Sequence, residues 1–289
     1  MKCVVPSRAV RATIAATAIL VFVGVPNSLW QTGASHAQSA PLFKNPSNVS
    51  AVYQIALNGF GIGSFRYTSE TSKTAYKLTS DVDLSLLMGA FQWKGVSRTS
   101  GQATDAALKP GAFGFDFSSS LKSGSVAMGF ANGSVKSVSI DPPAPTAPDT
   151  VPVKSEHLVN VLDPLSALLA LTQDKGGEPC NRRLAIFDGK QRFDLQLIYR
   201  RQEPIEGSSD TASVCRVKYI PIAGFRQTEE TANLARSTGI EISFRQAPGA
   251  RLFVPQKIVL PTLAGTAEIA LERIDIDTPG SGQVALINE

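Results

Sequence analysis

Histidine is almost missing from this chain of 289 residues, which contains only two. One of them, His36, lies in an N-terminal segment that has the pattern of a cleaved leader, so His157 is the one histidine expected in the mature protein. Histidine-based catalytic triads and multi-histidine metal sites therefore have almost no material here. The hydrolase motifs GxSxG and HExxH are absent as well. We therefore expect a non-catalytic protein without a metal or cofactor, in which His157 has a local structural role.

Charged residues are also scarce, at 18% of the chain, whereas 43% of the residues are hydrophobic. This composition excludes a disordered chain and indicates a globular protein. The net charge of +4 and the sequence pI of about 9.0 would suit a nucleic-acid-binding protein. Three of the cationic residues, however, lie within the first eleven positions. The basic character of the whole chain is therefore mainly a property of its N-terminus.

The first 37 residues have the pattern of a secretory signal peptide. The three cations precede an uncharged, mostly apolar stretch, 12–25, and small residues follow at Ser35 and Ala37. Signal peptidase reads small residues at these two positions, so we predict cleavage between Ala37 and Gln38. The apolar stretch is shorter than the roughly 20 residues that span a bilayer. We expect residues 38–289 to form a periplasmic protein that does not span the membrane.

The mature sequence is almost neutral and keeps two cysteines. Loss of the leader leaves 25 cationic against 24 acidic residues, so a nucleic-acid partner is not expected. Cys3 is removed with the leader, whereas Cys180 and Cys215 remain. In an oxidising compartment these two are most simply one disulfide, which would close a loop of 36 residues. The alternative is a reactive or metal-binding thiol pair, which neither a CxxC spacing nor a nearby histidine supports.

Short alternating segments separated by glycine and serine run from about Val49 to Ile140. The expected strands are 53–57, 64–68, 75–84, 91–99, 112–117, 125–130 and 135–140. Their spacing of about ten residues predicts an antiparallel meander. The glycine-rich stretch 59–63 superficially resembles a dinucleotide-binding loop, but a strand follows it instead of a helix. We therefore interpret it as a hairpin turn.

A proline-rich connector and one helix separate this meander from a second set of strands. Five prolines within 141–152 exclude a helix or an inner strand, so we expect an extended connector there. A helix is predicted at about 163–174, because Asp163 can cap it and Pro164 suits its first position. We expect this helix to fill the mouth or interior of a curved sheet.

Strands resume after the helix, at 193–199, 215–219, 240–245, 256–260 and 266–277. In the last of these, the apolar residues Ile269 and Leu271 are at odd positions, whereas Ile274 and Ile276 are at even positions. This shift predicts a β-bulge.

The region 158–225 contains several short motifs in a fixed order. They are Asp163–Leu169, Cys180–Leu184, Phe187–Gly189, Arg192–Leu195, Cys215 and Tyr219–Gly224. In these motifs the chain resembles the domain-of-unknown-function family 3108 of exported alphaproteobacterial proteins, and the flanking strands resemble that family in pattern. Its members have no agreed activity, so the resemblance implies export and fold. It further implies a fold similar to periplasmic β-spiral envelope-integrity proteins, in which a long spiralled sheet wraps a helix.

The densest group of charged residues lies just after Cys180. Arg182, Arg183 and Arg192 can be interpreted as contacts for an anion or a ligand, because guanidinium groups bind phosphate and carboxylate. The other interpretation is an ion-paired loop, in which Asp188 and Asp194 balance the arginines.

The predicted helix allows two interpretations of the protein interior. Leu165, Leu168 and Leu169, together with apolar strand residues, can line a cavity for a lipid chain or pack into a filled core. Periodicity does not distinguish a hollow interior from a filled one.

The expected fold is mainly β: a long antiparallel meander that forms a spiral or partly open β-barrel around one central helix, in a single domain, 38–289. The expected function is a non-catalytic contribution to cell-envelope integrity through binding of an envelope protein or a lipid-like ligand. The alternatives are a periplasmic lipid carrier and an enzyme that acts on an envelope polymer with Asp188 and Asp194 as its carboxylates.

Overall fold

The computed structural model of the protein describes residues 47–104, 107–143, 146–174, 176–247, 252–278 and 282–287. Ala37 and Gln38, the predicted cleavage site, lie outside these residues, as does the rest of the predicted leader. The described part of the chain is mainly β, as the sequence predicts.

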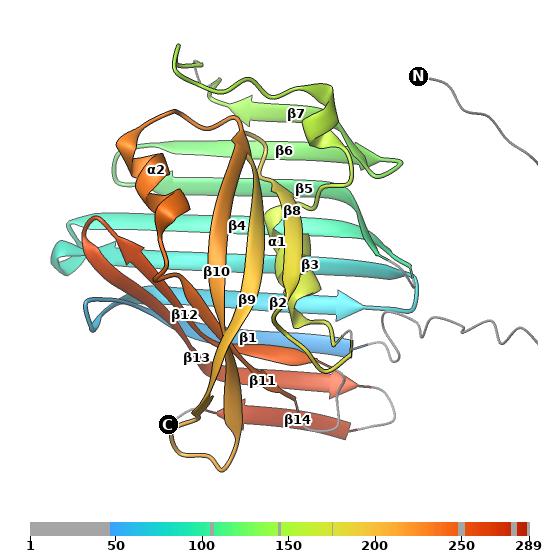
Figure 1. Ribbon diagram of the computed structural model, residues 1–289, viewed down its shortest axis with the longest axis vertical. Helices are drawn as coiled ribbons and strands as arrows, with labels where there is room; N and C mark the ends of the chain where they lie inside the picture. Colours follow the sequence, from blue (N-terminus) through green and yellow to red (C-terminus); the bar gives the residue numbers. More distant parts are fainter. Residues whose placement is uncertain are drawn as a thin grey trace, which may run out of the picture. The chain divides into compact units, whose positions relative to one another are not determined.

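The fourteen strands of the described residues form one antiparallel sheet (Figure 1). Neighbours follow the order β7-β6-β5-β4-β3-β2-β1-β13-β12-β11-β10-β9-β8, and β14 pairs with β13. Among the described residues β7 and β8 do not pair with each other, so the sheet is not closed. The strands are β1 Ser47–Leu57, β2 Phe60–Thr71, β3 Ala75–Leu86, β4 Phe91–Ala103, β5 Leu108–Ser119, β6 Ser123–Ala131, β7 Ser134–Asp141, β8 Arg182–Phe187, β9 Arg192–Pro204, β10 Thr211–Ala223, β11 Glu241–Gln246, β12 Phe253–Thr262, β13 Gly265–Thr278 and β14 Gly282–Ile287.

A short segment, 159–162, contacts both terminal strands of this order. Val159 forms an antiparallel bridge with Ser134 of β7, and Leu162 forms a parallel bridge with Ile186 of β8. The segment leads directly into the first helix, so the two terminal strands and the helix are joined by one stretch of backbone.

A hairpin turn follows β1 as predicted, but residues 60–63, which were expected in the turn, belong to β2. Asn58 and Gly59 connect β1 to β2 with φ values of 51° and 81°. Two successive positive φ angles are typical of the tight turns that match the twist of β-hairpins, and Asn-Gly is the favoured pair for them. Asn132 and Gly133 connect β6 to β7 in the same way, with φ values of 53° and 71°.

The predicted bulge is present in β13. Val52 of β1 pairs with Arg273, but the next residue, Tyr53, pairs with Leu271. Glu272 is therefore an extra residue, and the side chains after it change face.

The described residues contain two α-helices where the sequence predicts one. Helix α1, Pro164–Thr172, agrees with the prediction, and Asp163 is its N-cap. Helix α2, Glu229–Arg236, was missed, although Thr228 caps it and both Glu229 and Glu230 lie in its first turn. It has only eight residues, of which Leu234 is the one large apolar residue and none is buried, so the periodic signal is short. Two 3-10 helices, η1 (Leu87–Gly89) and η2 (Ser155–Leu158), complete the list.

The other corrections concern boundaries and two short strands. Strand β7 includes Asp141, so the proline-rich connector begins one residue later than predicted. Strands β8 and β14, of six residues each, were not predicted. Within the connector, Thr150 bridges Arg226, which ties this segment to the end of β10.

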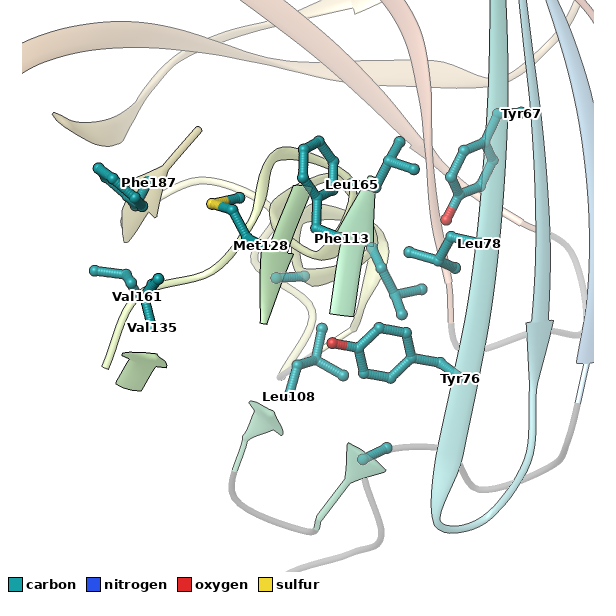
Figure 2. Close-up of a cluster of buried hydrophobic side chains, with 13 residues drawn as sticks. Tyr67, Tyr76, Leu78, Leu108, Phe113, Met128, Val135, Val161, Leu165 and Phe187 are labelled. Carbon is teal, nitrogen blue, oxygen red and sulfur yellow. The ribbon is translucent and has the colours of Figure 1, made fainter. Parts of the chain in front are cut away.

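The interior contains three clusters of buried apolar side chains. The first joins β2–β8 to α1 and includes Leu78, Phe113 and Leu165 (Figure 2). The second surrounds the disulfide and includes Leu171 of α1. The third joins β1, β12 and β13. Helix α1 contacts strands from both halves of the sheet, namely β3, β4, β5, β8 and β12.

A buried carboxylate fixes the N-terminus of α1. Asp163 Oδ1 accepts a hydrogen bond from the backbone N–H of Ser166 at 3.0 Å. Its Oδ2 accepts from Ser166 Oγ at 2.5 Å and from Thr99 Oγ1 of β4 at 3.0 Å. Tyr76 of β3 joins the network through a 2.8 Å hydrogen bond between its hydroxyl and that of Ser166. Burial raises the pKa of the Asp163 carboxyl, against the opposing effect of these hydrogen bonds.

We expect the difference in unfolding free energy between the wild-type protein and Asp163→Asn to become smaller as pH rises from about 4 to 8. Asparagine caps helices as well as aspartate but does not titrate. Because folding raises the pKa of Asp163 above its ordinary value of 3.8, its contribution is largest below that value and is lost as pH rises through the raised pKa. Urea unfolding across this range measures the difference. A difference that is constant with pH would contradict the expectation, and Asp116→Asn, at an exposed position of β5, is the control.

The disulfide predicted from sequence is present, between Cys180 and Cys215, whose Cα atoms are 5.5 Å apart. Both cysteines are buried in the second apolar cluster.

Cys180→Ser should lower the free energy of unfolding by about 2–5 kcal/mol, because the unfolded chain then loses a constraint on its loop. Thermal denaturation measures the loss, and thiol titration of the denatured variant should find one free thiol, from Cys215. An unchanged melting temperature would show that the disulfide does not stabilise the fold.

Candidate functional site

An apolar cavity of about 330 Å³ lies between the sheet and α1. Its walls come from β1, β2, β12, β13 and α1, with one residue from β3. The lining residues are Ser47, Val49, Ala51, Tyr53, Phe65, Tyr67, Ser69, Thr71, Val82, Leu168, Leu169, Thr172, Leu252, Phe253, Val254, Pro255, Ile258, Ile269, Ile274 and Ile276. None of these side chains is charged.

Strand pleating and the β13 bulge together build the sheet side of the cavity. β1 contributes every second residue from Ser47 to Tyr53, as the alternation of side chains in a strand requires. β13 contributes Ile269 before the bulge and Ile274 and Ile276 after it. These isoleucines differ in parity, and only the extra residue Glu272 allows all three to face the same space.

Helix α1 forms the opposite wall through Leu168, Leu169 and Thr172. Leu168 and Leu169 were expected to line a cavity if the interior were hollow. Leu165 was expected beside them, but it packs into the first apolar cluster and does not line the cavity. Leu168 and Leu169 therefore contact both the first apolar cluster and the cavity, whereas Leu165 contributes to the core alone.

One end of the cavity is lined by hydroxyl groups. Ser47 pairs with Thr71, and Val49 pairs with Ser69, so β1 and β2 bring Ser47, Ser69 and Thr71 together. The backbone N–H of Ser47 donates to Thr71 Oγ1 at 3.1 Å, and the hydroxyls of these two residues are also 3.1 Å apart. Tyr53 and Phe65, a tilted aromatic pair with centroids 5.7 Å apart, line the cavity farther along the same strands.

Two of the lining hydroxyls have buried oxygen atoms without a hydrogen bond of acceptable geometry among the described residues. These are Tyr67 Oη and Ser69 Oγ, and both side chains are more than nine-tenths buried. Leaving a buried polar group unsatisfied costs about 1–3 kcal/mol. Burial raises the pKa of Tyr67, and the neighbouring Ser69 opposes this shift, so Tyr67 is an uncharged phenol that can donate.

The three arginines near Cys180 all bind acceptors within the protein. Arg183 Nη2 lies 2.6 Å from Asp194 Oδ2, and Arg192 Nη1 lies 2.5 Å from Asp194 Oδ1. Arg182 Nη1 donates to the backbone carbonyl of Ala170 at 3.1 Å, so this cation caps the C-terminal turn of α1. These contacts fit the ion-paired interpretation of the cluster. Contact of these arginines with an external anion stays a prediction.

The carboxylates considered for catalysis have structural partners. Asp194 is buried between two arginines, and Asp188 Oδ1 accepts the backbone N–H groups of Lys190 and Gln191 at 2.8 and 2.6 Å in a turn. His157 Nδ1 accepts the backbone N–H of Lys154 at 3.1 Å, which is a local structural contact at the start of η2.

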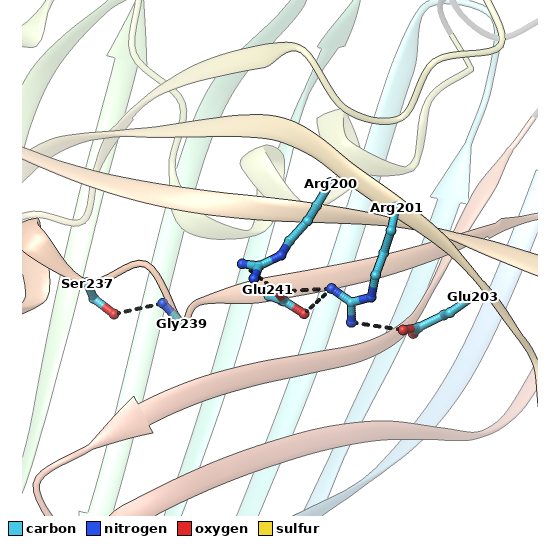
Figure 3. Close-up of polar contacts among 6 residues, drawn as sticks. All are labelled: Arg200, Arg201, Glu203, Ser237, Gly239 and Glu241. Atoms are coloured by element: carbon cyan, nitrogen blue, oxygen red, sulfur yellow. Dashed lines mark hydrogen bonds and ion pairs between the residues drawn. The ribbon is translucent and has the colours of Figure 1, made fainter.

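Another polar cluster spans β9 and β11 (Figure 3). Arg200 and Arg201 both reach Glu241, with N–O distances of 3.1 and 3.0 Å, and Arg201 also contacts Glu203 at 3.0 Å. Adjacent residues can converge in this way because the pairing of β9 with β10 shifts between Tyr199 and Arg201. An arginine thus lies between the two carboxylates of this cluster.

Sequence reasoning did not single out Tyr67 and Ser69. The alternation of Phe65, Tyr67, Ser69 and Thr71 along β2 was the available signal, since it puts these side chains on one face. The described residues contain no group of three or more His, Cys, Asp or Glu suited to hold a metal ion. In the same part of the chain no helix has the length and apolarity needed to cross a membrane.

Comparisons with known proteins place this geometry in a family. No curated protein matches the chain. Its fold is similar to the crystal structure of a β-barrel-like protein of the domain of unknown function DUF1849 from Brucella abortus, with a TM-score of 0.50 and 14% sequence identity over 81% of this chain and 98% of that chain. The model of the family of proteins of unknown function DUF3108 matches residues 52–271, which include all the motifs that carried the resemblance and most of the cavity lining. The chain belongs to the DUF3108 family.

Proposed function

We propose that this protein is a non-catalytic periplasmic protein that binds one lipid-like ligand in the cavity and supports the integrity of the cell envelope in that way. The observation that carries the proposal is the uncharged cavity between the sheet and α1. Its volume of about 330 Å³ is at the lower end of the range for ligand pockets, about 300–1,000 Å³. The size favours a single acyl or isoprenoid chain over a lipid with several chains.

The wider architecture supports this proposal. The N-terminal 37 residues have the pattern of an export signal, and the buried disulfide is typical of proteins in oxidising compartments. Contacts of α1 with strands from both halves of the sheet favour a spiral or partly open barrel around this helix. Such a fold encloses apolar space without closing the sheet.

The hydroxyl-lined end of the cavity gives the ligand an orientation. Tyr67 and Ser69 offer two donors and acceptors, whereas no lining residue offers a charge to compensate an ion. Burying an unpaired charge is far more costly than burying a hydrogen-bonded polar group. We propose that the ligand carries an uncharged hydrogen-bonding group, such as an alcohol or an ester.

A lipid carrier differs from this proposal only in releasing its ligand to a partner. The cavity supports either of these functions. An enzyme is less favoured, because Asp194 is paired with two arginines and Asp188 binds backbone N–H groups in a turn. The cavity fits a small apolar ligand and does not by itself support binding of an envelope protein.

Native mass spectrometry of protein purified from the periplasm should find one small apolar molecule bound per chain. Ala51→Leu is expected to weaken this binding, because Ala51 is the small residue between Tyr67 and Ile274 on the cavity wall and leucine would fill the space. Fluorescence displacement by dodecanol measures the affinity, and a thermal melt checks that the variant folds. Absence of a co-purified molecule together with no binding of dodecanol would refute the proposal.

Dodecanol should bind more tightly than dodecanoate at pH 8, and Tyr67→Phe combined with Ser69→Ala should weaken dodecanol binding by about 2- to 10-fold, the loss expected for a hydrogen bond. Tyr219→Phe is the matched control, since the Tyr219 hydroxyl binds Gln191 and this side chain does not line the cavity. Tighter binding of dodecanoate would contradict an uncharged ligand. It would point to Arg245, which pairs with Val254 of the lining and whose buried Nε and Nη2 have no hydrogen bond to any described residue.

A further inference from the structure

The most exposed large apolar side chains of the described residues are all in or directly beside hairpin turns. Phe60, Leu87, Leu121 and Leu263 are 77%, 80%, 84% and 86% exposed, and Met88 is fully exposed. We call these five residues the apolar tips. The next most exposed large apolar residue, Ile287, is 65% exposed. Single exposed apolar residues are normal, but several gathered on one face of a protein indicate an interaction surface.

The strand order places all the apolar tips at one end of the sheet. In an antiparallel meander the turns β1–β2, β3–β4 and β5–β6 lie at the same end, as Figure 1 shows. The turn between β12 and β13 joins them, because β13 runs antiparallel to β1 with Leu57 paired to Ala267. Four hairpins that are far apart in sequence therefore present their apolar tips together.

Hydrogen bonds hold neighbouring tips in register. Asn58 Nδ2 donates to the carbonyl of Ala264 at 3.0 Å, and the backbone N–H of Thr266 donates to Asn58 Oδ1 at 2.9 Å. These bonds join the β1–β2 turn to the β12–β13 turn. Ser120 joins the β5–β6 turn to the start of β4, because its Oγ accepts the backbone N–H of Gln92 at 3.0 Å. The tips are thus fixed relative to one another before any partner binds.

The opposite end of the sheet has a different character. Its described turn residues between β2 and β3 are Ser72, Lys73 and Thr74, and those between β6 and β7 are Asn132 and Gly133. No large apolar residue of these turns is exposed. Among the described turns of the sheet, strongly exposed apolar side chains are therefore found at one end and not in every hairpin.

The charged residues near the apolar tips indicate what kind of surface the tips bind. The turns 58–60, 87–90, 120–122 and 263–265 contain one charged residue, the exposed Lys122, and no carboxylate. Separate apolar side chains with a flanking cation suit the interface of an anionic bilayer, which accepts them at any spacing. A protein partner would need a matching pocket for each tip.

We propose that the protein docks on an anionic lipid surface through the apolar tips, with Leu, Phe and Met side chains entering the interface and Lys122 close to the lipid phosphates. This surface is separate from the cavity, so docking does not require a bound ligand. It adds a location to the proposed function, namely the face of a membrane.

Sedimentation with vesicles of phosphatidylcholine and phosphatidylglycerol tests the proposal on the mature chain. Trp93, the one tryptophan after residue 37, lies near the start of β4 and gives a second readout, since its emission should shift to shorter wavelength on docking. Changing all five apolar tips to serine should lower vesicle partitioning more than about tenfold, because the apolar area that leaves water is lost. Their exposure means that the fold should survive, which a thermal melt checks.

The matched control changes exposed apolar residues elsewhere, with Val138→Ser, Val153→Ser and Tyr199→Ser, and should bind as wild type. Lys122→Gln should weaken binding to the anionic vesicles and leave binding to pure phosphatidylcholine unchanged.

Equal partitioning of the tip variant and wild type would overturn the proposal, as would absence of vesicle binding by wild type. Self-association in sedimentation velocity that the tip variant abolishes, without vesicle binding, would assign the tips to a dimer instead. The affinity for dodecanol should be the same in all these variants. Failure of the docking proposal can therefore be distinguished from failure of the cavity proposal.

Discussion

The arrangement of the interior depends on the buried carboxylate of Asp163. Helix α1 has only nine residues, and a helix this short is marginal without tertiary contacts. Asp163 caps its first turn and binds Thr99 of the sheet, while Arg182 binds the carbonyls of its last turn. The helix is therefore held at both ends by side chains that reach across from strands or from its own cap. Together with the apolar packing of α1 against the strands, these contacts position the wall that Leu168 and Leu169 give to the cavity.

Local signals in the sequence predict most of this fold. Alternating apolar residues, glycine turns and a change of parity were enough for most strands, the Asn58-Gly59 hairpin and the β13 bulge, because each depends on neighbouring residues. The helix α1 and the disulfide were predicted for the same reason, from a capping pattern and a cysteine count. Helix α2 was missed because it has only eight residues and a single large apolar residue, Leu234, which is too short a pattern to recognise.

The candidate site was less predictable because it depends on distant pairings. Val49, Tyr67 and Ile274 are brought to one cavity by the order β2-β1-β13, which no local pattern reveals. Periodicity shows that Tyr67 and Ser69 share a face of their strand, but not that this face lines a cavity. The same holds for Leu263 and Phe60, which meet only through the pairing of β1 with β13.

The segment 159–162 has a consequence for how the protein behaves at high concentration. An open sheet has two edges whose unpaired N–H and C=O groups can template strand addition and aggregation. Here the backbone beside Val159 and Leu162 occupies part of both edges, at β7 and at β8. Because this segment continues into α1, undocking of the helix would free both edges at once. Protection against aggregation is thereby coupled to the hydrogen bonds of one buried aspartate.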